Sequence, residues 1–254
     1  MKPSTFLRAF VFAVIIVGVL PGLALAQGAT VADATFVDAN WSLTVFPAGN
    51  GGSVGASQTT ISGNPLRSVN DTVNGTPSVI LGTHIYTPFS YNPAVSGPIS
   101  TVSYSESAIC LSGCFGDGQS TGPALRQGGI LYIYNVTLVT GPGTTFAPLA
   151  LTGLAAASFS QVAVTTTGLF NDVHPDFSSN GAPIQFGFFR ANGSGPSAGY
   201  SLVGGIDNWQ VTVTAAAPQP TAAPADIPAL GPMAISGLGL LLVLAGIPYL
   251  RRRG

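Results

Sequence analysis

Apolar and polar residues alternate along several segments of the chain, which is the period of a β-strand with one buried face. The segments with the clearest alternation are residues 40–47, 128–139, 182–191 and 207–214, and weaker ones cover residues 78–87, 99–109 and 158–166. The side chains that this pattern predicts to face a core are Trp41, Leu43, Val45, Ile184, Phe186, Phe188, Trp209, Val211 and Val213. In residues 128–139 Leu131 and Ile133 lie opposite Ile130, Tyr132, Tyr134, Val136 and Leu138, so we expect this strand to be covered on both faces at its start.

Stretches rich in Gly, Asn and Pro separate these segments, as "AGNGGSVG", "SGNP", "VNGTP" and "GDGQSTGP" illustrate. Such residues supply the backbone conformations that turns require. No segment between them predicts an amphipathic helix, and Pro148 and Gly153 interrupt residues 146–159, which we interpret as a loop or an edge strand. Many strands without helices predict an all-β fold, an antiparallel β-sandwich of jelly-roll type.

The N-terminus has the three parts of a secretory signal peptide. Lys2 and Arg8 precede the apolar residues 9–23, and small residues follow up to Ala26. We therefore predict that signal peptidase cleaves between Ala26 and Gln27. The alternative is an uncleaved N-terminal anchor, for which the apolar run is short.

The C-terminal part of the chain has a different composition. Residues 215–226 are rich in Pro and Ala, which is typical of an extended linker. Residues 233–250 carry no charge and, at about 1.5 Å per residue, form a helix long enough to cross a bilayer once. The cluster Arg251, Arg252 and Arg253 follows, which acts as a stop-transfer signal and places the C-terminus in the cytoplasm.

A short motif precedes this predicted transmembrane helix, and its residues are Ile227, Pro228, Ala229, Leu230 and Gly231. Motif, single span and terminal arginines together resemble the C-terminal sorting signals of Gram-negative bacteria that exosortases process, in particular the IPTL-CTERM type. Ala229 stands where that type usually has Thr, and the residues from Gly231 onward depart from its usual continuation. The resemblance implies that an exosortase-type enzyme cuts near the motif; the alternative is a permanent membrane anchor.

These features predict four parts: a signal peptide at residues 1–26, a β-sandwich ectodomain at residues 27–214, a linker at residues 215–226, and the sorting motif, transmembrane helix and Arg cluster at residues 227–254. The chain is then exported through the inner membrane. It crosses the membrane once in transit and reaches the cell surface or the extracellular space after processing.

The charge of the exported part excludes one class of partner. Between Gln27 and Asp226 the basic residues are Arg67, Arg126 and Arg190, whereas all nine acidic residues of the chain lie there, so this part has a net charge of −6. Nucleic-acid binding depends on clustered Lys and Arg. We therefore predict no nucleic-acid partner.

Two cysteines, Cys110 and Cys114, lie close together in a chain that the signal peptide directs to an oxidising compartment. We predict a local disulfide that fixes one turn. A zinc site would need further ligands, and the two histidines, His84 and His174, are distant in sequence.

Few residues could support catalysis or bind a metal. Asp172, His174 and Asp176 could form a metal or acid/base cluster, but we favour a polar loop with Asx turns. Glu106 is the only glutamate, so a glycosidase with paired carboxylates would need Glu106 with an Asp, or two Asp. We predict no cofactor; calcium remains an alternative with unassigned ligands, for which the candidates are Asp117, Asp172, Asp176 and Asp207.

Aromatic residues such as Tyr86, Tyr91 and Tyr104 could stack on a sugar ring, but in strands they more often fill a core, where we also place Trp209. The stretches "SGNP", "LRQGGILY" and "GGIDNWQVTV" give the domain a loose similarity to concanavalin-like or carbohydrate-module-like sandwiches. The favoured function is a non-enzymatic surface or extracellular-matrix protein. The alternatives are a carbohydrate-binding module, with a glycan as partner, and a secreted hydrolase.

Overall fold

The computed structural model describes residues 28–75, 77–113, 118–134, 138–140, 145–163, 170–194 and 198–217. The predicted signal peptide, the sorting motif, the transmembrane helix and its arginines lie outside these residues. Within them, no helix is long and apolar enough to cross a membrane. The described part is all-β, as the alternation predicted, with one short helix, α1 (Pro93–Ser96), and two 3₁₀ turns, η1 (Asp38–Asn40) and η2 (Ala156–Ser158).

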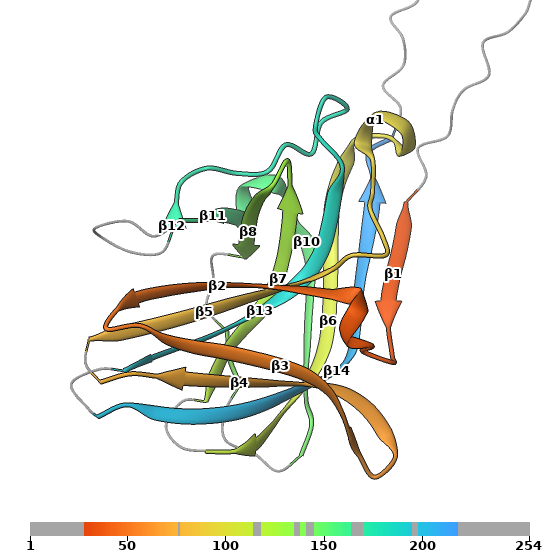
Figure 1. Ribbon diagram of the computed structural model, residues 1–254. Helices are drawn as coiled ribbons and strands as arrows, with labels where there is room; N and C mark the ends of the chain where they lie inside the picture. The colour runs from red at the N-terminus through yellow and green to blue at the C-terminus, as the bar shows by residue number, and fades with distance from the viewer. Residues whose placement is uncertain are drawn as a thin grey trace, which may run out of the picture. The chain divides into compact units, whose positions relative to one another are not determined.

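The strands form two antiparallel sheets (Figure 1). The six-stranded sheet has the order β10 (Ala147–Leu154), β6 (Ile99–Ser112), β14 (Tyr200–Ala215), β4 (Asn64–Val73), β3 (Gly52–Ile61), with β1 (Ala29–Asp33) also paired to β14. The eight-stranded sheet has the order β12 (Phe170–Asn171), β11 (Phe159–Val162), β8 (Ile130–Tyr134), β7 (Gln119–Gln127), β13 (Ile184–Ser194), β5 (Ser78–Tyr86), β2 (Trp41–Gly49), with β9 (Leu138–Thr140) also paired to β7.

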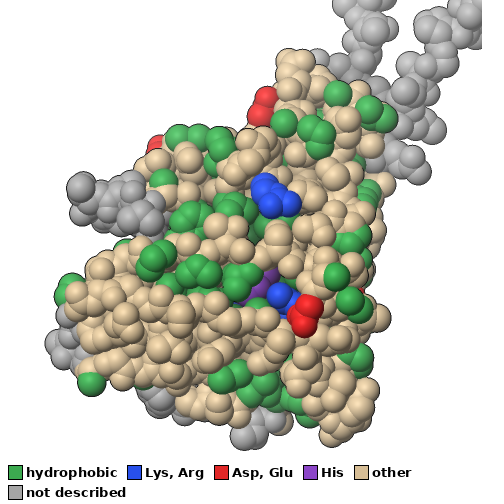
Figure 2. All heavy atoms as spheres, in the orientation of Figure 1, with side chains coloured by type: hydrophobic (Ala, Val, Ile, Leu, Met, Phe, Trp, Pro, Cys, Tyr) green, Lys and Arg blue, Asp and Glu red, His purple; other side chains and the backbone are tan. Residues whose placement is uncertain are grey.

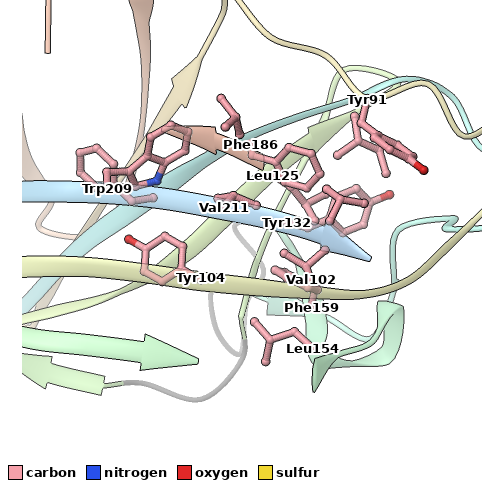
Figure 3. Close-up of a cluster of buried hydrophobic side chains, with 14 of the residues drawn as sticks. Tyr91, Val102, Tyr104, Leu125, Tyr132, Leu154, Phe159, Phe186, Trp209 and Val211 are labelled. Atoms are coloured by element: carbon pink, nitrogen blue, oxygen red, sulfur yellow. The ribbon is translucent and has the colours of Figure 1, made fainter. Parts of the chain in front are cut away.

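The two sheets pack face to face around an aromatic core (Figure 3). Trp41 of β2 contacts Phe188 of β13 and Trp209 of β14, with ring centroids 5.3 and 4.9 Å apart and edge-to-face geometry. Such pairs add to the stabilisation that burial of their area provides. The predicted core residues Trp41, Ile184, Phe186, Phe188, Trp209, Val211 and Val213 are buried, whereas Leu43 and Val45 on edge strand β2 are half-buried.

The eight-stranded sheet is apolar on both faces. Successive residues of a strand point to opposite faces, and Phe188 belongs to the core between the sheets while Phe189 belongs to a second cluster. We call this second cluster the outer-face cluster; its buried members are Leu81, Ile85, Ala124, Leu131, Ile133, Val162 and Phe189. The prediction that residues 128–139 begin with a strand covered on both faces is confirmed for β8. β8 and β9 pair with successive parts of β7, and residues 135–137 between them lie outside the described residues, so the prediction of one continuous strand stays a prediction.

Alternation missed strands built from small polar residues. β3 and β4 form a hairpin whose turn has Ser62 and Gly63 at φ 50° and 81°, the mirror-image turn that matches the twist of antiparallel strands. The stretch predicted as a turn from Gly116 to Pro123 is wrong in its second half, where β7 already runs. Gly122 is needed within β7, since a Cβ there would lie 2.9 Å from the Phe189 ring. Residues 146–159 include β10, which is an edge strand.

Candidate functional site

Glu106, the only glutamate, lies inside the sandwich and cannot meet a substrate. Its side chain is 0 % exposed and forms an ion pair with Arg190 at 3.2 Å. Thr121 donates a hydrogen bond to Oε1 at 2.6 Å, and the Tyr104 hydroxyl donates to Oε2 at 2.5 Å. Burial, with the Glu106 charge second, raises the pKa of Tyr104 well above 10. Glu106 therefore belongs to a buried polar network that fixes how the sheets pack, and the hydrolase interpretation loses its candidate acid.

Two further titratable groups adjoin this network. His84 is fully buried and stacks on Phe188 with ring centroids 4.5 Å apart, while Arg190 lies over the same ring at 5.0 Å. Burial, reinforced by the charges of Arg67 and Arg190, lowers the pKa of His84 well below 6.5. Burial also raises the pKa of Asp71 to about 7, against the opposing effects of Gln119 and Arg190. These groups are positioned for packing and have no access to solvent.

The polar loop of Asp172, His174 and Asp176 does not form a metal or catalytic cluster. His174 Nε2 lies 3.2 Å from Asp172 Oδ1, and its Nδ1 lies 2.6 Å from the Phe159 carbonyl oxygen. Asp176 instead accepts a hydrogen bond from the backbone of Ser178, which with the Ser178 hydroxyl lowers its pKa below 3.8. The loop interpretation therefore fits these contacts better.

The other metal and disulfide predictions have mixed outcomes. In the described ranges, no three His, Cys, Asp or Glu side chains come together to hold a metal. Asp207 accepts hydrogen bonds from Asn64 and from the backbone of Asn208, and Asp117 lies outside the described residues. Cys110 is disulfide-bonded, and the chain's other cysteine, Cys114, lies outside the described residues.

A pocket of about 170 Å³ opens on the outer face of the eight-stranded sheet. Leu81, Ile133 and Phe189 of the outer-face cluster line it, and β5, β8 and β13 bring them together. Val79 and Phe170 also line it and are 37 % and 43 % exposed. We call this site the outer-face pocket. Figure 2 shows one face of the molecule with a hollow that contains apolar side chains and has basic, acidic and histidine side chains at its edge.

The outer-face pocket also contains aromatic and uncharged polar groups. Tyr134 lines it, half-buried, but its ring packs against the core between the sheets and meets that of Phe159 edge-to-face; the exposed ring in the lining is that of Phe170. Asn192 also belongs to the lining, but its side chain lies on the core-facing side of β13, as that of Arg190 does: Asn192 is 5 % exposed, and its Nδ2 donates to the Gly118 carbonyl oxygen at 2.9 Å and lies 3.3 Å from the Tyr200 hydroxyl. The side chain of Ser120, which lies on the outer face, makes no hydrogen bond to described residues.

Among the described residues that line the outer-face pocket, none has a charged side chain. Arg126 occupies the same face of β7 as Ser120, but Gln185 holds its guanidinium at 2.7 and 3.0 Å. The pocket therefore offers apolar contact, aromatic rings and neutral hydrogen-bonding groups. It does not offer charge complementarity to an anionic or a cationic ligand.

The sequence predictions missed this pocket. Of its lining, Tyr134 and Ile133 lay in a predicted strand, but Phe170 and Asn192 stood in segments without a clear pattern. The doublet Phe188-Phe189 was the available signal, because two successive large apolar residues indicate a strand with two covered faces. The aromatic residues for which sugar stacking was the alternative lie largely in the core, as favoured: Tyr91 and Tyr104 are each 2 % exposed, and Tyr86 is half-buried.

No protein-family model matches the chain, and no curated protein matches it. Among solved structures, it is similar to a family 11 carbohydrate-binding module from Clostridium thermocellum in complex with a β-1,3-1,4-mixed-linked tetrasaccharide, at 11 % identity over 76 % of this chain and 98 % of that one, with a TM-score of 0.42. It is also similar to the CBM22-1 xylan-binding domain from Paenibacillus barcinonensis Xyn10C, at 11 % identity over 76 % of this chain and 96 % of that one, with a TM-score of 0.37. A third similar structure is a CBM4 module, at 10 % identity over 71 % of this chain and 100 % of that one, with a TM-score of 0.36. None of these similarities assigns the chain to a family.

Proposed function

We propose that the β-sandwich is a non-catalytic domain that binds a neutral glycan in the outer-face pocket. The observation that carries this proposal is the composition of the pocket: the exposed ring of Phe170 stands with Phe189 and with Ser120, whose side chain makes no hydrogen bond to described residues, and no described lining side chain is charged. We also propose a jelly-roll connection, since the chain passes between the sheets from β4 to β5, from β5 to β6 and from β6 to β7.

Sugar rings match this composition physically. Their C–H faces are apolar and pack on aromatic rings, whereas their edges carry hydroxyls that both donate and accept hydrogen bonds. The Ser120 hydroxyl would donate to or accept from one sugar hydroxyl. The pocket volume of about 170 Å³ is below the usual range for drug-sized ligands, which favours a single ring or a chain end.

The test uses a fragment of residues 27–218. Both hydrophobic clusters lie within it, and residues up to Pro218 form one compact unit. Affinity electrophoresis through gels with soluble neutral polysaccharides, including mixed-linked β-glucan and xylan, should retard the fragment in at least one gel. Charged polysaccharides such as pectate should not retard it, because the pocket carries no cation.

Two variants locate the binding. Phe170→Ala removes a ring that is already 43 % exposed, so it should weaken retardation without unfolding the domain. Val95→Ala is the matched control, since Val95 is 80 % exposed on α1 and does not line the pocket. Equal retardation of Phe170→Ala and the wild type would remove the pocket from the proposal, and no retardation in any gel would remove glycan binding itself.

We propose in addition that this domain is exported and that its C-terminal tag is processed by an exosortase-type enzyme. The support is the signal-peptide pattern ending at Ala26, the motif beginning at Ile227, and the disulfide bond of Cys110, which is typical of oxidising compartments. Intact-mass analysis of the protein from its native host tests this. A mass ending near residue 227 is expected, whereas a membrane-bound species that keeps Arg251 to Arg253 would leave only a permanent anchor.

A further inference from the structure

The outer face of the six-stranded sheet, opposite the proposed site, is covered by hydroxyl groups in register. On β6 and β14 the core-facing residues alternate with outward-facing ones, and the register pairs Thr212 with Ser103 and Gln210 with Ser105. β1 extends one row, because Thr30 pairs with Thr212 and their hydroxyl oxygens lie 3.1 Å apart. Three strands thus present a row of neutral donors and acceptors.

A pocket of about 150 Å³ interrupts this face where β6, β10 and β14 meet. β10 shifts its register against β6 between Leu151 and Leu154, and Gly153 in that interval has φ 71°, so the edge strand bends there. Ala150, Thr152 and the β6 and β14 side chains of the hydroxyl row line the cavity. We call this site the hydroxyl pocket.

The side chains of the hydroxyl pocket are available for a ligand. Those of Ser103, Ser105, Thr152 and Gln210 make no hydrogen bond within the described part of the chain. Each hydroxyl can donate one hydrogen bond and accept two, and the amide adds two donors and an acceptor. No lining side chain carries a charge, and Tyr104, the aromatic member, is buried.

We propose that the hydroxyl pocket is a second binding site for a neutral glycan, which lets one domain hold two polysaccharide chains at once. This inference rests on the proposed function of the outer-face pocket. The two sites lie on the outer faces of the two opposed sheets, so their ligands do not compete for space. The hydroxyl pocket lacks an exposed ring, so it binds the hydroxyl edges of a sugar and binds more weakly, since exposed hydrogen bonds replace equally good bonds to water.

A domain with two sites cross-links polysaccharides. When one face of the domain holds a polysaccharide chain, the other face stays close to neighbouring polysaccharide chains. Its local concentration there is raised, so a weak second contact becomes effective in a polymer network. Precipitation or gelation of a soluble polysaccharide by the purified domain is the expected consequence.

Binding stoichiometry with a short oligosaccharide tests the inference, with the polysaccharide selected by affinity electrophoresis as its source. The wild-type fragment should bind two molecules per chain, one about tenfold or more weaker than the other. A variant with Ser105→Ala and Gln210→Ala, both at non-buried positions, should bind one and no longer precipitate the polymer. Ser57→Ala is the matched control, because Ser57 is exposed on β3 and does not line the hydroxyl pocket.

The outcomes separate the two proposals. One molecule per chain in the wild type, unchanged in Ser105→Ala with Gln210→Ala, overturns the second site and leaves the outer-face pocket intact. Loss of all binding in that variant, with Phe170→Ala unaffected, overturns the outer-face pocket and keeps the hydroxyl pocket. No binding to any glycan overturns both, and light scattering excludes precipitation through self-association of the domain.

Discussion

Arg190 and Glu106 form an ion pair in the interior of the sandwich, with Nη1 3.2 Å from Oε2 and both side chains at most 1 % exposed. Arg190 comes from β13 of the eight-stranded sheet and Glu106 from β6 of the six-stranded sheet, so the pair connects the two layers. Burying such a pair costs free energy, because both charges lose their hydration. Mutating only one partner destabilises the protein further, because the other charge stays buried without a partner.

Glu106→Gln should therefore destabilise the domain strongly. The expected loss in the free energy of unfolding is about 3 to 5 kcal/mol, as for other broken buried pairs, measured by urea denaturation. Asp172→Asn is the control: it removes a carboxylate that pairs with His174 but is 98 % exposed, so its midpoint should stay near that of the wild type. An unchanged midpoint for Glu106→Gln would contradict the account of this pair.

Asp71 should make the protein less stable as the pH rises. Its pKa is about 7 in the folded state against an ordinary value of 3.8, so the folded state binds more protons between these two values. The Asp71 contribution to stability is therefore full below pH 4 and is lost as the pH rises toward 7. Asp71→Asn should remove this loss, so that its melting temperature exceeds that of the wild type at pH 8 by more than at pH 4.

His84 should act in the opposite direction. The pKa of His84 in the folded state lies well below 6.5, so below pH 6.5 the unfolded state binds a proton that the folded state does not. The stability of the protein therefore decreases as the pH decreases. In the wild type, the opposite pH dependences of stability that Asp71 and His84 cause offset each other between about pH 4 and 6.5. Melting temperatures of Asp71→Asn should fall with decreasing pH, and those of His84→Phe should rise. Parallel profiles for the two variants would refute the assignment.

Gly187 should not tolerate a side chain. An added Cβ would overlap the carbonyl oxygen of His84 on the neighbouring strand β5, where neither backbone can move without breaking the ladder. Gly187→Ala should lower the melting temperature by several degrees or abolish folding. Gly55→Ala is the matched control, because a Cβ on Gly55 meets nothing within 4 Å; equal melting temperatures of the two variants would show that the strands can separate.

The sequence predicted the fold class from residues such as Trp209, Val211 and Val213, whose period-two pattern reports one buried face directly. It missed β3 because Ser, Thr and Gly in a largely accessible strand resemble a loop, and it missed β4 because the buried polar residues Arg67 and Asp71 interrupt its apolar pattern. The outer-face pocket was not predictable, since it joins Leu81, Tyr134 and Phe170 from three strands whose order follows from long-range pairing. The sequence indicated Glu106 as a candidate catalytic acid. Its ion pair with buried Arg190 was not predictable, because the two residues lie far apart in the sequence.

The central claim is that a neutral glycan binds in the outer-face pocket, and mapping of the bound sugar by amide chemical shifts tests it most directly. The isotope-labelled fragment is titrated with a short neutral oligosaccharide. The largest amide chemical-shift changes should occur at Leu81, Ile133, Phe189 and Asn192, and they should saturate as the oligosaccharide concentration rises. The same titration should leave α1 unchanged. Largest shifts outside the strands that line the pocket, β5, β7, β8, β12 and β13, or no shifts with any neutral oligosaccharide, would contradict the account.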